Sequence, residues 1–357
     1  MYIELVIIVC VFVVSLVLTK VLIVVSNRMS WIAAVNDRSS HLSATPIGGG
    51  VSIVFSLLLG LILQMSTFQV IPYYILLLII GIFLLAVIGF LDDLLEVSII
   101  YRLIVQFGIV SIFLVLSFST LTITSAVGKM ALFAATLFVL VWWINLYNFM
   151  DGIDGIAAIQ SISILVCYLV LISLRVQEGD VIAREILTYS IVVCLASVTG
   201  FIVFNWSPAK IFMGDVGSLP IPYFIGVIAI IGLFSKLAPI WSWIIPTGVF
   251  TVDASYTLGR RILQREIWWK PHRTHAYQNL AVWLQAKHNK GDEVRTRAAA
   301  HRLVSLLILV FNIFWLTPLA LFSQAYPSFG ILILVVAWFP ILLYAVYWSR
   351  TLYEKHS

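Results

Sequence analysis

The sequence predicts an all-α integral membrane protein with about eleven transmembrane helices. Of its 357 residues, 62% are apolar and only 10% are charged, a balance that the surface of a water-soluble domain of this length would not tolerate. Apolar runs recur along the chain, and a run of about 20 residues spans a hydrocarbon core roughly 30 Å thick. Aspartate-bearing segments lie where several of these runs end, so we expect a helix bundle with its chemistry at one membrane face.

Eleven apolar runs mark the expected helices. In chain order they cover residues 2–25, 48–66, 71–91, 100–118, 130–147, 155–174, 186–205, 217–235, 238–258, 303–323 and 328–348. The first run is too long for the apolar core of a cleavable signal, and no basic segment or small-residue cleavage site accompanies it, so we expect a retained span. No internal repeat or low-complexity linker divides the chain. We therefore expect a single polytopic domain over 1–357.

Lys and Arg are distributed unevenly between the connecting segments. When the spans alternate in direction, 17 of the 21 basic residues fall on one side and 4 on the other. The side richer in Lys and Arg is cytoplasmic by the positive-inside rule. We therefore expect a periplasmic N-terminus, a cytoplasmic C-terminus and a cytoplasmic active site. The inner segments are then 26–47, 92–99, 148–154, 206–216 and a long substrate loop at about 259–302, in which 278–288 is expected to form a helix along the headgroup boundary.

Four aspartate-bearing clusters fall on that inner side. They are Asp92-Asp93, the stretch 148–155, the stretch 212–218, and Asp253 with Arg260-Arg261 beyond it. An Asp at the centre of a spanning helix costs roughly 2.5 to 3.5 kcal/mol on the insertion scale. Carboxylates collected at one membrane face therefore indicate a bound cation or proton transfer.

The first two clusters have the chemistry of a cation site. Asp92 and Asp93 are adjacent and repel each other, so one of them holds a proton unless a cation compensates; the alternative is a solvated helix end. Asn148, Asp151 and Asp154 supply hard oxygen ligands of the kind that Mg²⁺ accepts. A helix N-cap would explain one of these Asp residues, but not both together with the Asn.

The stretch 205–218 combines an aromatic residue with an acidic helix entry. Asp215 precedes a Gly and a Ser at the start of a span, where free backbone N–H groups could face an anion. Phe212 could stack on a base. The alternative is a capped helix with an aromatic anchor.

Two polar loops carry the remaining candidate residues. His272 and His275 lie three apart, but no Cys and no third His completes a zinc site, and with Arg273 they suit a polyphosphate better because Arg binds phosphate oxygens in bidentate fashion. Arg38 and His41 could also reach phosphates. A positive-inside anchor is the alternative for the basic residues. The net charge of +5 does not suggest nucleic acid, because most Lys and Arg lie beside spans.

Together these motifs resemble the polyprenyl-phosphate N-acetylhexosamine-1-phosphate transferase superfamily, glycosyltransferase family 4. The resemblance runs in order through the Thr45-Pro46-x-Gly-Gly loop, Asp92-Asp93, Asn148-x-x-Asp151-Gly-Ile-Asp154-Gly, Phe212-Met-Gly-Asp215-x-Gly-Ser, Asp253 before Arg260-Arg261, and the histidine loop. Arg38-Ser-Ser-His41 and the stretch 272–278 look like the bacterial O-antigen-initiating branch. The peptidoglycan branch differs, because its loop carries three consecutive histidines.

The resemblance implies a reaction at the bacterial inner membrane. An N-acetylated sugar 1-phosphate would pass from a UDP-sugar (UDP-N-acetylfucosamine, UDP-N-acetylquinovosamine or UDP-GlcNAc) to undecaprenyl phosphate, with release of UMP and with Mg²⁺, or Mn²⁺ in its place. This step would initiate O-antigen or a related surface polysaccharide.

The resemblance also implies residue roles. By matched position, Asp215 would be the principal metal ligand and Asn148 a weaker one. The uridine pocket would contain Asp154, Asn205 and Phe212. The catalytic set would be Asp92 or Asp93 at the lipid phosphate, Asp151, and His272, Arg273 and His275 at the sugar diphosphate, while Arg38 and His41 would bind substrate.

A cation-coupled secondary transporter is the rival class. Transporters place their carboxylates near the bilayer midplane, often on broken helices in two related halves, whereas here they cluster at one face and the halves show no similarity. The sequence leaves open which sugar is used, whether displacement is direct or passes through a covalent intermediate, and the oligomeric state, a homodimer included.

Overall fold

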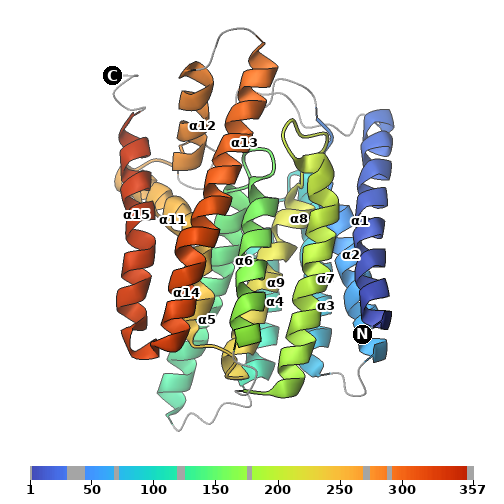
Figure 1. Ribbon diagram of the computed structural model, residues 1–357, viewed down its shortest axis with the longest axis vertical. Coiled ribbons are helices and arrows are strands. Elements are labelled where there is room, and N and C mark those ends of the chain that lie inside the picture. Colours follow the sequence, from blue (N-terminus) through green and yellow to red (C-terminus); the bar gives the residue numbers. More distant parts are fainter. Residues whose placement is uncertain are drawn as a thin grey trace.

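The computed structural model describes residues 2–29, 45–67, 72–118, 125–174, 179–267, 274–287 and 292–351. Over these ranges the regular structure consists of helices without a strand, and the helices run side by side along the long axis of the molecule (Figure 1). Nine of the described helices are long and apolar enough to cross a membrane. The all-α membrane fold expected from the sequence is therefore confirmed.

The helices follow the apolar runs closely. The first seven are α1 (Tyr2–Met29), α2 (Gly50–Thr67), α3 (Tyr73–Leu95), α4 (Ile99–Phe118), α5 (Ala126–Phe149), α6 (Ile156–Leu174) and α7 (Val181–Asn205). They are followed by α8 (Asp215–Ser218), α9 (Pro220–Phe234), α10 (Ile240–Ile244), η1 (Ile245–Thr247), α11 (Gly248–Leu263), α12 (Ala276–Lys287), α13 (Glu293–Phe311), η2 (Asn312–Leu316), α14 (Thr317–Ala325), η3 (Pro327–Phe329) and α15 (Gly330–Thr351).

Two of the eleven predicted spans fall short of a regular long helix in the described chain. The second is the shorter apolar helix Gly50–Ser66. The ninth is divided between α10, the 3₁₀ turn η1 and α11, and Pro246 lies in that turn. Proline interrupts a helix because it lacks an N–H and collides with the preceding turn. The count of eleven spans stays a prediction.

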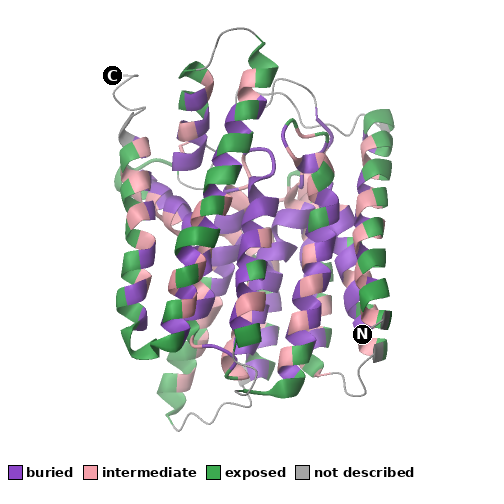
Figure 2. Ribbon diagram, viewed as in Figure 1, coloured by how far each residue is buried: buried purple, intermediate pink, exposed green. Residues whose placement is uncertain are grey.

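The centre of the bundle is formed by α6, α7 and α9. In the most apolar stretch of each span, 72% of the residues of α6 and 78% of those of the α8–α9 segment are buried, against 22% for α1 and α5 (Figure 2). Large apolar side chains are exposed on the outer helices, as at Ile3 on α1 and Phe339 on α15. This outward apolar surface is what a bundle in hydrocarbon requires.

One end of the bundle collects most of the polar segments. In Figure 1, α1 runs from the lower to the upper end, α15 ends at the upper end, and the loops that follow α5 and α7 lie there with α12. The sequence placed these segments on one side, and they do share one end. Which face of a membrane that end meets stays a prediction.

The helix expected at residues 278–288 is present as α12. It packs against α13 and α15, and its buried residues include Tyr277 and Leu284. In Figure 1 it stands upright at the end of the bundle. Part of its apolar side therefore covers protein, while Val282 and Trp283 are exposed, and its position at a headgroup boundary stays a prediction.

Candidate active site

The carboxylates of α3 hold the start of α8. Asp93 accepts hydrogen bonds from the backbone N–H groups of Asp215 (2.9 Å, to Oδ1) and Val216 (3.2 Å, to Oδ2). The first N–H groups of a helix have no partner within it, so Asp93 acts as a cap supplied from another helix. Gly89 permits the approach, because a Cβ there would collide with the carbonyl group of Asp215.

Arg102 lies inside this carboxylate cluster. It is in the first turn of α4, where its Nη2 lies 3.1 Å from Asp215 Oδ2 while Nη1 donates to Asp92 Oδ2. Sequence reasoning counted Arg102 only as a basic residue that sets orientation. A signal was present, because an Arg just inside an apolar span is costly unless it is paired, and the nearest acidic pair on the same side is Asp92-Asp93.

Asn148, at the end of α5, lies beside Asp215. Its Nδ2 donates to Asp215 Oδ1 and to Ser218 Oγ, both at 2.8 Å. Both oxygens of Asp215 therefore have polar neighbours, since Arg102 is at Oδ2 and Asn148 at Oδ1. The structure brings together the two residues that the sequence predicts as metal ligands, and each is engaged with protein groups.

The cluster carries excess negative charge. Asp151 is half-buried in the loop after α5, and burial, followed by the charges of Asp215, Asp93 and Asp154, raises its pKa to about 7. Among the described residues, Arg102 pairs directly with Asp92 and Asp215. A site with this balance attracts a further cation.

The donor set suits Mg²⁺ in chemical type, because carboxylate and amide oxygens are the ligands that Mg²⁺ takes. Within the described ranges, however, no three His, Cys, Asp or Glu side chains are arranged as a ready metal site. In this structure Arg102 and Asn148 contact the two oxygens of Asp215. A metal ion held by Asp215 Oδ2 would compete with Arg102 for that oxygen.

Asp154 joins three segments of the chain. It is buried, and its Oδ2 accepts from Ser207 Oγ (2.7 Å) and from the N–H of Ala209 (3.1 Å). His301 of α13 places Nδ1 3.5 Å from the same oxygen. Ser305, one turn further along α13, donates to the backbone oxygen of Asp154 at 3.2 Å. Sequence reasoning missed His301, which lies in no recognisable motif.

The other two residues expected in a uridine pocket lie at the end of α7 and in the loop that follows it. Asn205 Oδ1 accepts from the N–H of Gly155 (3.1 Å), and its Nδ2 donates to the carbonyl of Ile211 (2.9 Å). Phe212 is half-buried, and its N–H donates to the carbonyl of Pro46 at 2.8 Å. The loops after α5 and α7 are thus tied together, and the described end of the first polar loop pairs with them.

The histidine loop is anchored by Asp253. This buried residue of α11 accepts from the N–H groups of Ala276 (3.0 Å) and Tyr277 (3.2 Å) at the start of α12. His275 is 1% exposed, with Nδ1 3.5 Å from Asp253 Oδ1. The Tyr277 hydroxyl lies beside Gly152, next to Asp151. The start of α12 therefore covers the aspartate loop.

The predicted roles of the histidine and first polar loops remain predictions. The ring of His275 is covered in this structure and would have to move to contact a diphosphate. Four further predicted site residues, Arg38, His41, His272 and Arg273, lie outside the described residues.

Known proteins are similar to this chain over the part that contains these residues. Residues 75–233 match the family model described as Glycosyl transferase family 4. A probable undecaprenyl-phosphate N-acetylglucosaminyl 1-phosphate transferase of Bacillus subtilis (strain 168) is 30% identical over 285 residues, which cover 75% of this chain and 74% of that protein. The chain belongs to glycosyl transferase family 4.

Two further relatives are similar over shorter stretches. Phospho-N-acetylmuramoyl-pentapeptide-transferase of Carboxydothermus hydrogenoformans is 32% identical over 203 residues, 50% of this chain and 59% of that protein. The Lactococcus lactis subsp. cremoris (strain MG1363) protein of the same name is 30% identical over 236 residues, 61% of this chain and 67% of that protein. Neither the donor sugar nor the O-antigen branch follows from these names.

The family-4 match encloses the carboxylate cluster. Asp92, Arg102, Asn148 and Asp215 all lie within residues 75–233, whereas α11 to α13, with His275 and His301, lie beyond it. The arrangement pairs several carboxylates with one guanidinium at the end of a membrane bundle. Such a site can bind a divalent cation and hold phosphate groups beside it, which are the two requirements of phosphoryl transfer.

Proposed function

We propose that this protein transfers an N-acetylated sugar 1-phosphate from a UDP-sugar to undecaprenyl phosphate and releases UMP. The observation that carries the proposal is a carboxylate cluster at one end of a membrane-spanning bundle of family 4. Arg102 pairs with Asp92 and Asp215 there, and Asp93 accepts the backbone N–H of Asp215. A lipid phosphate and a soluble nucleotide sugar can meet only at such a place, where the bundle ends and water begins.

The bonds that form and break in this reaction indicate a role for each residue of the carboxylate cluster. An oxygen of the lipid phosphate bonds to the phosphorus that carries the sugar, and the bond from that phosphorus to the bridging oxygen breaks, so that UMP leaves with the bridging oxygen. Asp92 or Asp93 receives any proton carried by the attacking phosphate. Arg102, once released from Asp215, faces the negative charge that develops on the phosphoryl oxygens.

Mg²⁺, when bound, would supply Lewis-acid neutralisation of the diphosphate, with Asp215 as its principal ligand and Asn148 as a weaker one; Mn²⁺ would substitute. Asp154, Asn205 and Phe212 would receive the uridine. Two observations support these roles. The oxygen donors lie at one end of the bundle, and Asp154 and Asn205 form hydrogen bonds that connect the loop after α5 with the loop after α7.

The donor that we propose is an N-acetylated sugar such as UDP-N-acetylfucosamine, UDP-N-acetylquinovosamine or UDP-GlcNAc, in the initiation of O-antigen or a related surface polysaccharide. The stretch 272–278, which resembles that branch, supports this choice. We place the enzyme in the bacterial inner membrane with the carboxylates at the cytoplasmic face, because 17 of the 21 Lys and Arg residues fall on that side when the spans alternate.

A panel assay tests the proposal. Purified protein would be given each UDP-N-acetylsugar with and without undecaprenyl phosphate, and UMP release would be measured. We expect release only when the lipid, a divalent cation and one class of donor are all present. Release that is independent of the lipid, or no release with any donor while solute uptake into proteoliposomes is observed, would refute it.

A further inference from the structure

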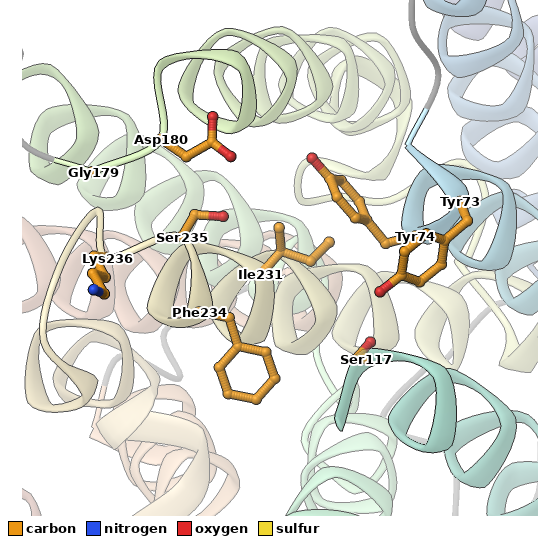
Figure 3. A pocket seen from close by; sticks show the side chains of 9 residues that line it. All are labelled: Tyr73, Tyr74, Ser117, Gly179, Asp180, Ile231, Phe234, Ser235 and Lys236. Atoms are coloured by element: carbon orange, nitrogen blue, oxygen red, sulfur yellow. The ribbon is translucent and has the colours of Figure 1, made fainter. Parts of the chain in front are cut away.

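A second polar site lies at the end of the bundle opposite the carboxylates. There the first turns of α3 and α7 meet the last turns of α4 and α9 around a partly open cavity of about 480 Å³ (Figure 3). Cavities of this size are large enough for a small ligand or a lipid headgroup. None of its lining residues takes part in the proposed reaction.

Two exposed residues of opposite charge, Asp180 and Lys236, line one side of the cavity. Asp180 and Lys236 lie on two turns that are joined by the hydrogen bond from Asp180 N to Ser235 O at 3.0 Å. Gly179 has φ 78°, and a Cβ there would lie 2.6 Å from Ser235 O, so the turn needs glycine. Asp180 is further held as the cap of α7, since its Oδ1 accepts from Ile182 N at 2.9 Å.

The facing wall is aromatic. Tyr74 of α3 extends its hydroxyl across the cavity toward Asp180, and the neighbouring Tyr73 points toward Ser117 (Figure 3). The Tyr73 hydroxyl donates to Leu116 O at 3.3 Å, which ties α3 to α4. Tyrosines of this kind, with an apolar ring and a polar tip, are typical of the headgroup level of a membrane.

We propose that this cavity binds the headgroup of a zwitterionic aminophospholipid, with its ammonium at Asp180 and its phosphate at Lys236. The two side chains sum to zero charge, so a ligand that carries only one sign of charge meets one repulsive partner. The Tyr74 hydroxyl and ring face add a second partner for the ammonium. Together these groups match a headgroup with separated positive and negative charges.

The surrounding surface favours a lipid over a soluble zwitterion. Ile231 and Phe234 of α9 add apolar surface to the lining. Large apolar side chains are exposed on two of the helices that bound the cavity, as at Leu76 on α3 and Val115 on α4. A bound headgroup would therefore have its acyl chains beside apolar surface, which a soluble ligand could not use.

Lipid binding to the purified full-length chain tests the proposal. The delipidated protein would be offered phosphatidylethanolamine, phosphatidylcholine and phosphatidylglycerol with identical acyl chains, and the bound lipid would be counted by native mass spectrometry. We expect phosphatidylethanolamine to bind more tightly than phosphatidylglycerol by about threefold to fivefold, the size of effect that one exposed ion pair produces.

Two variants separate the charges without disturbing the turns. Asp180→Asn keeps an oxygen that can cap α7 and should abolish the preference for phosphatidylethanolamine over phosphatidylglycerol. Lys236→Asn suits the backbone, because Asn tolerates the φ of 56° found there, and it should weaken both lipids. Asp292→Asn is the matched control, since Asp292 caps α13 through Val294 N outside the cavity.

The outcomes are decisive in either direction. Equal binding of the three lipids to the parent protein, or a preference that survives both variants, would show that only non-specific surrounding lipid is bound and would overturn the proposal. Loss of preference in Asp292→Asn would do the same. Because binding is measured without nucleotide sugar, the result does not depend on the transferase activity.

Discussion

Arg102 Nη2 lies 3.1 Å from Asp215 Oδ2, and the same guanidinium donates to Asp92. This ion pair connects the start of α4 with the end of α3 and the start of α8. The singly charged guanidinium of Arg102 thus lies beside Asp215, the carboxylate that is the strongest candidate for binding a divalent metal ion. We therefore expect metal binding and the position of Arg102 to be coupled.

Removing Arg102 should strengthen metal binding while it weakens catalysis. In Arg102→Gln no side-chain cation must withdraw from Asp215, and close charge pairs are commonly coupled by at least about 1.5 kcal/mol. Mn²⁺ should then bind about tenfold more tightly in the absence of substrate, and turnover should fall. Electron paramagnetic resonance of free Mn²⁺ measures the first effect. Arg102→Lys, which retains the charge, is the control. An unchanged Mn²⁺ affinity in Arg102→Gln would show that Arg102 and the metal are not coupled.

Replacing Asp215 by Asn should nearly abolish turnover. The substitution keeps the shape and a hydrogen-bonding oxygen for Asn148 but removes the charge that would hold the metal. A Lewis-acid metal contributes several kcal/mol to the transition state, so kcat should fall by about a thousandfold or more. UMP release from EDTA-treated membranes with Mg²⁺ restored provides the measurement. Near-normal turnover would mean that Asp215 is not the principal ligand.

Asp151 should make the metal-free protein less stable as pH rises. Its pKa of about 7 lies above the value of about 3.9 for an unfolded Asp. Between these values the folded state binds more protons than the unfolded state, so the free energy of unfolding falls as pH rises through this interval. At pH values below both pKa values, Asp151 does not change the free energy of unfolding. At pH values above both, its full destabilising contribution is present.

The neutral variant Asp151→Asn removes that cost. Without divalent cations, we expect it to raise the melting temperature clearly at pH 8 and much less at pH 4.5, as read by scanning fluorimetry in detergent. A gain of equal size at both pH values would trace the effect to packing and not to ionisation.

The sequence predicted the helices well because apolar length is nearly sufficient to identify a membrane span. It also placed Asn148 and Asp215 at one end, because alternation of spans decides on which side each loop lies. It could not predict that Asp93 caps α8 or that Asp253 caps α12. Those contacts depend on which helices are neighbours, and neighbours in a bundle are chosen by side-chain packing that no single motif records.

Asp253 should control the docking of α12. It is 1% exposed and accepts two N–H groups at the start of that helix. Asp253→Ala would leave both without their acceptor, at roughly 1 to 3 kcal/mol for each buried group. We expect faster hydrogen exchange throughout α12 and a higher KM for the UDP-sugar, with Asp253→Asn intermediate. Unchanged exchange in α12 with normal protection elsewhere would contradict the docking role.

His301 should tune nucleotide binding through Asp154. Its Nδ1 lies 3.5 Å from Asp154 Oδ2, and this carboxylate also holds Ser207 and the N–H of Ala209 in the loop after α7. If Asp154 receives the uridine, a side chain that positions Asp154 acts on binding of the nucleotide and not on the phosphoryl step. His301→Phe keeps the size of the ring and removes both nitrogens.

The kinetic signature of that variant follows from the geometry. The KM for the UDP-sugar should rise several-fold, product inhibition by UMP should weaken by the same factor, and kcat should change little, because uniform binding is lost. The KM for undecaprenyl phosphate provides the internal control and should not move. Were kcat to fall while UMP inhibition kept its strength, His301 and Asp154 would be supporting the reacting phosphates, and the uridine would have to be bound elsewhere.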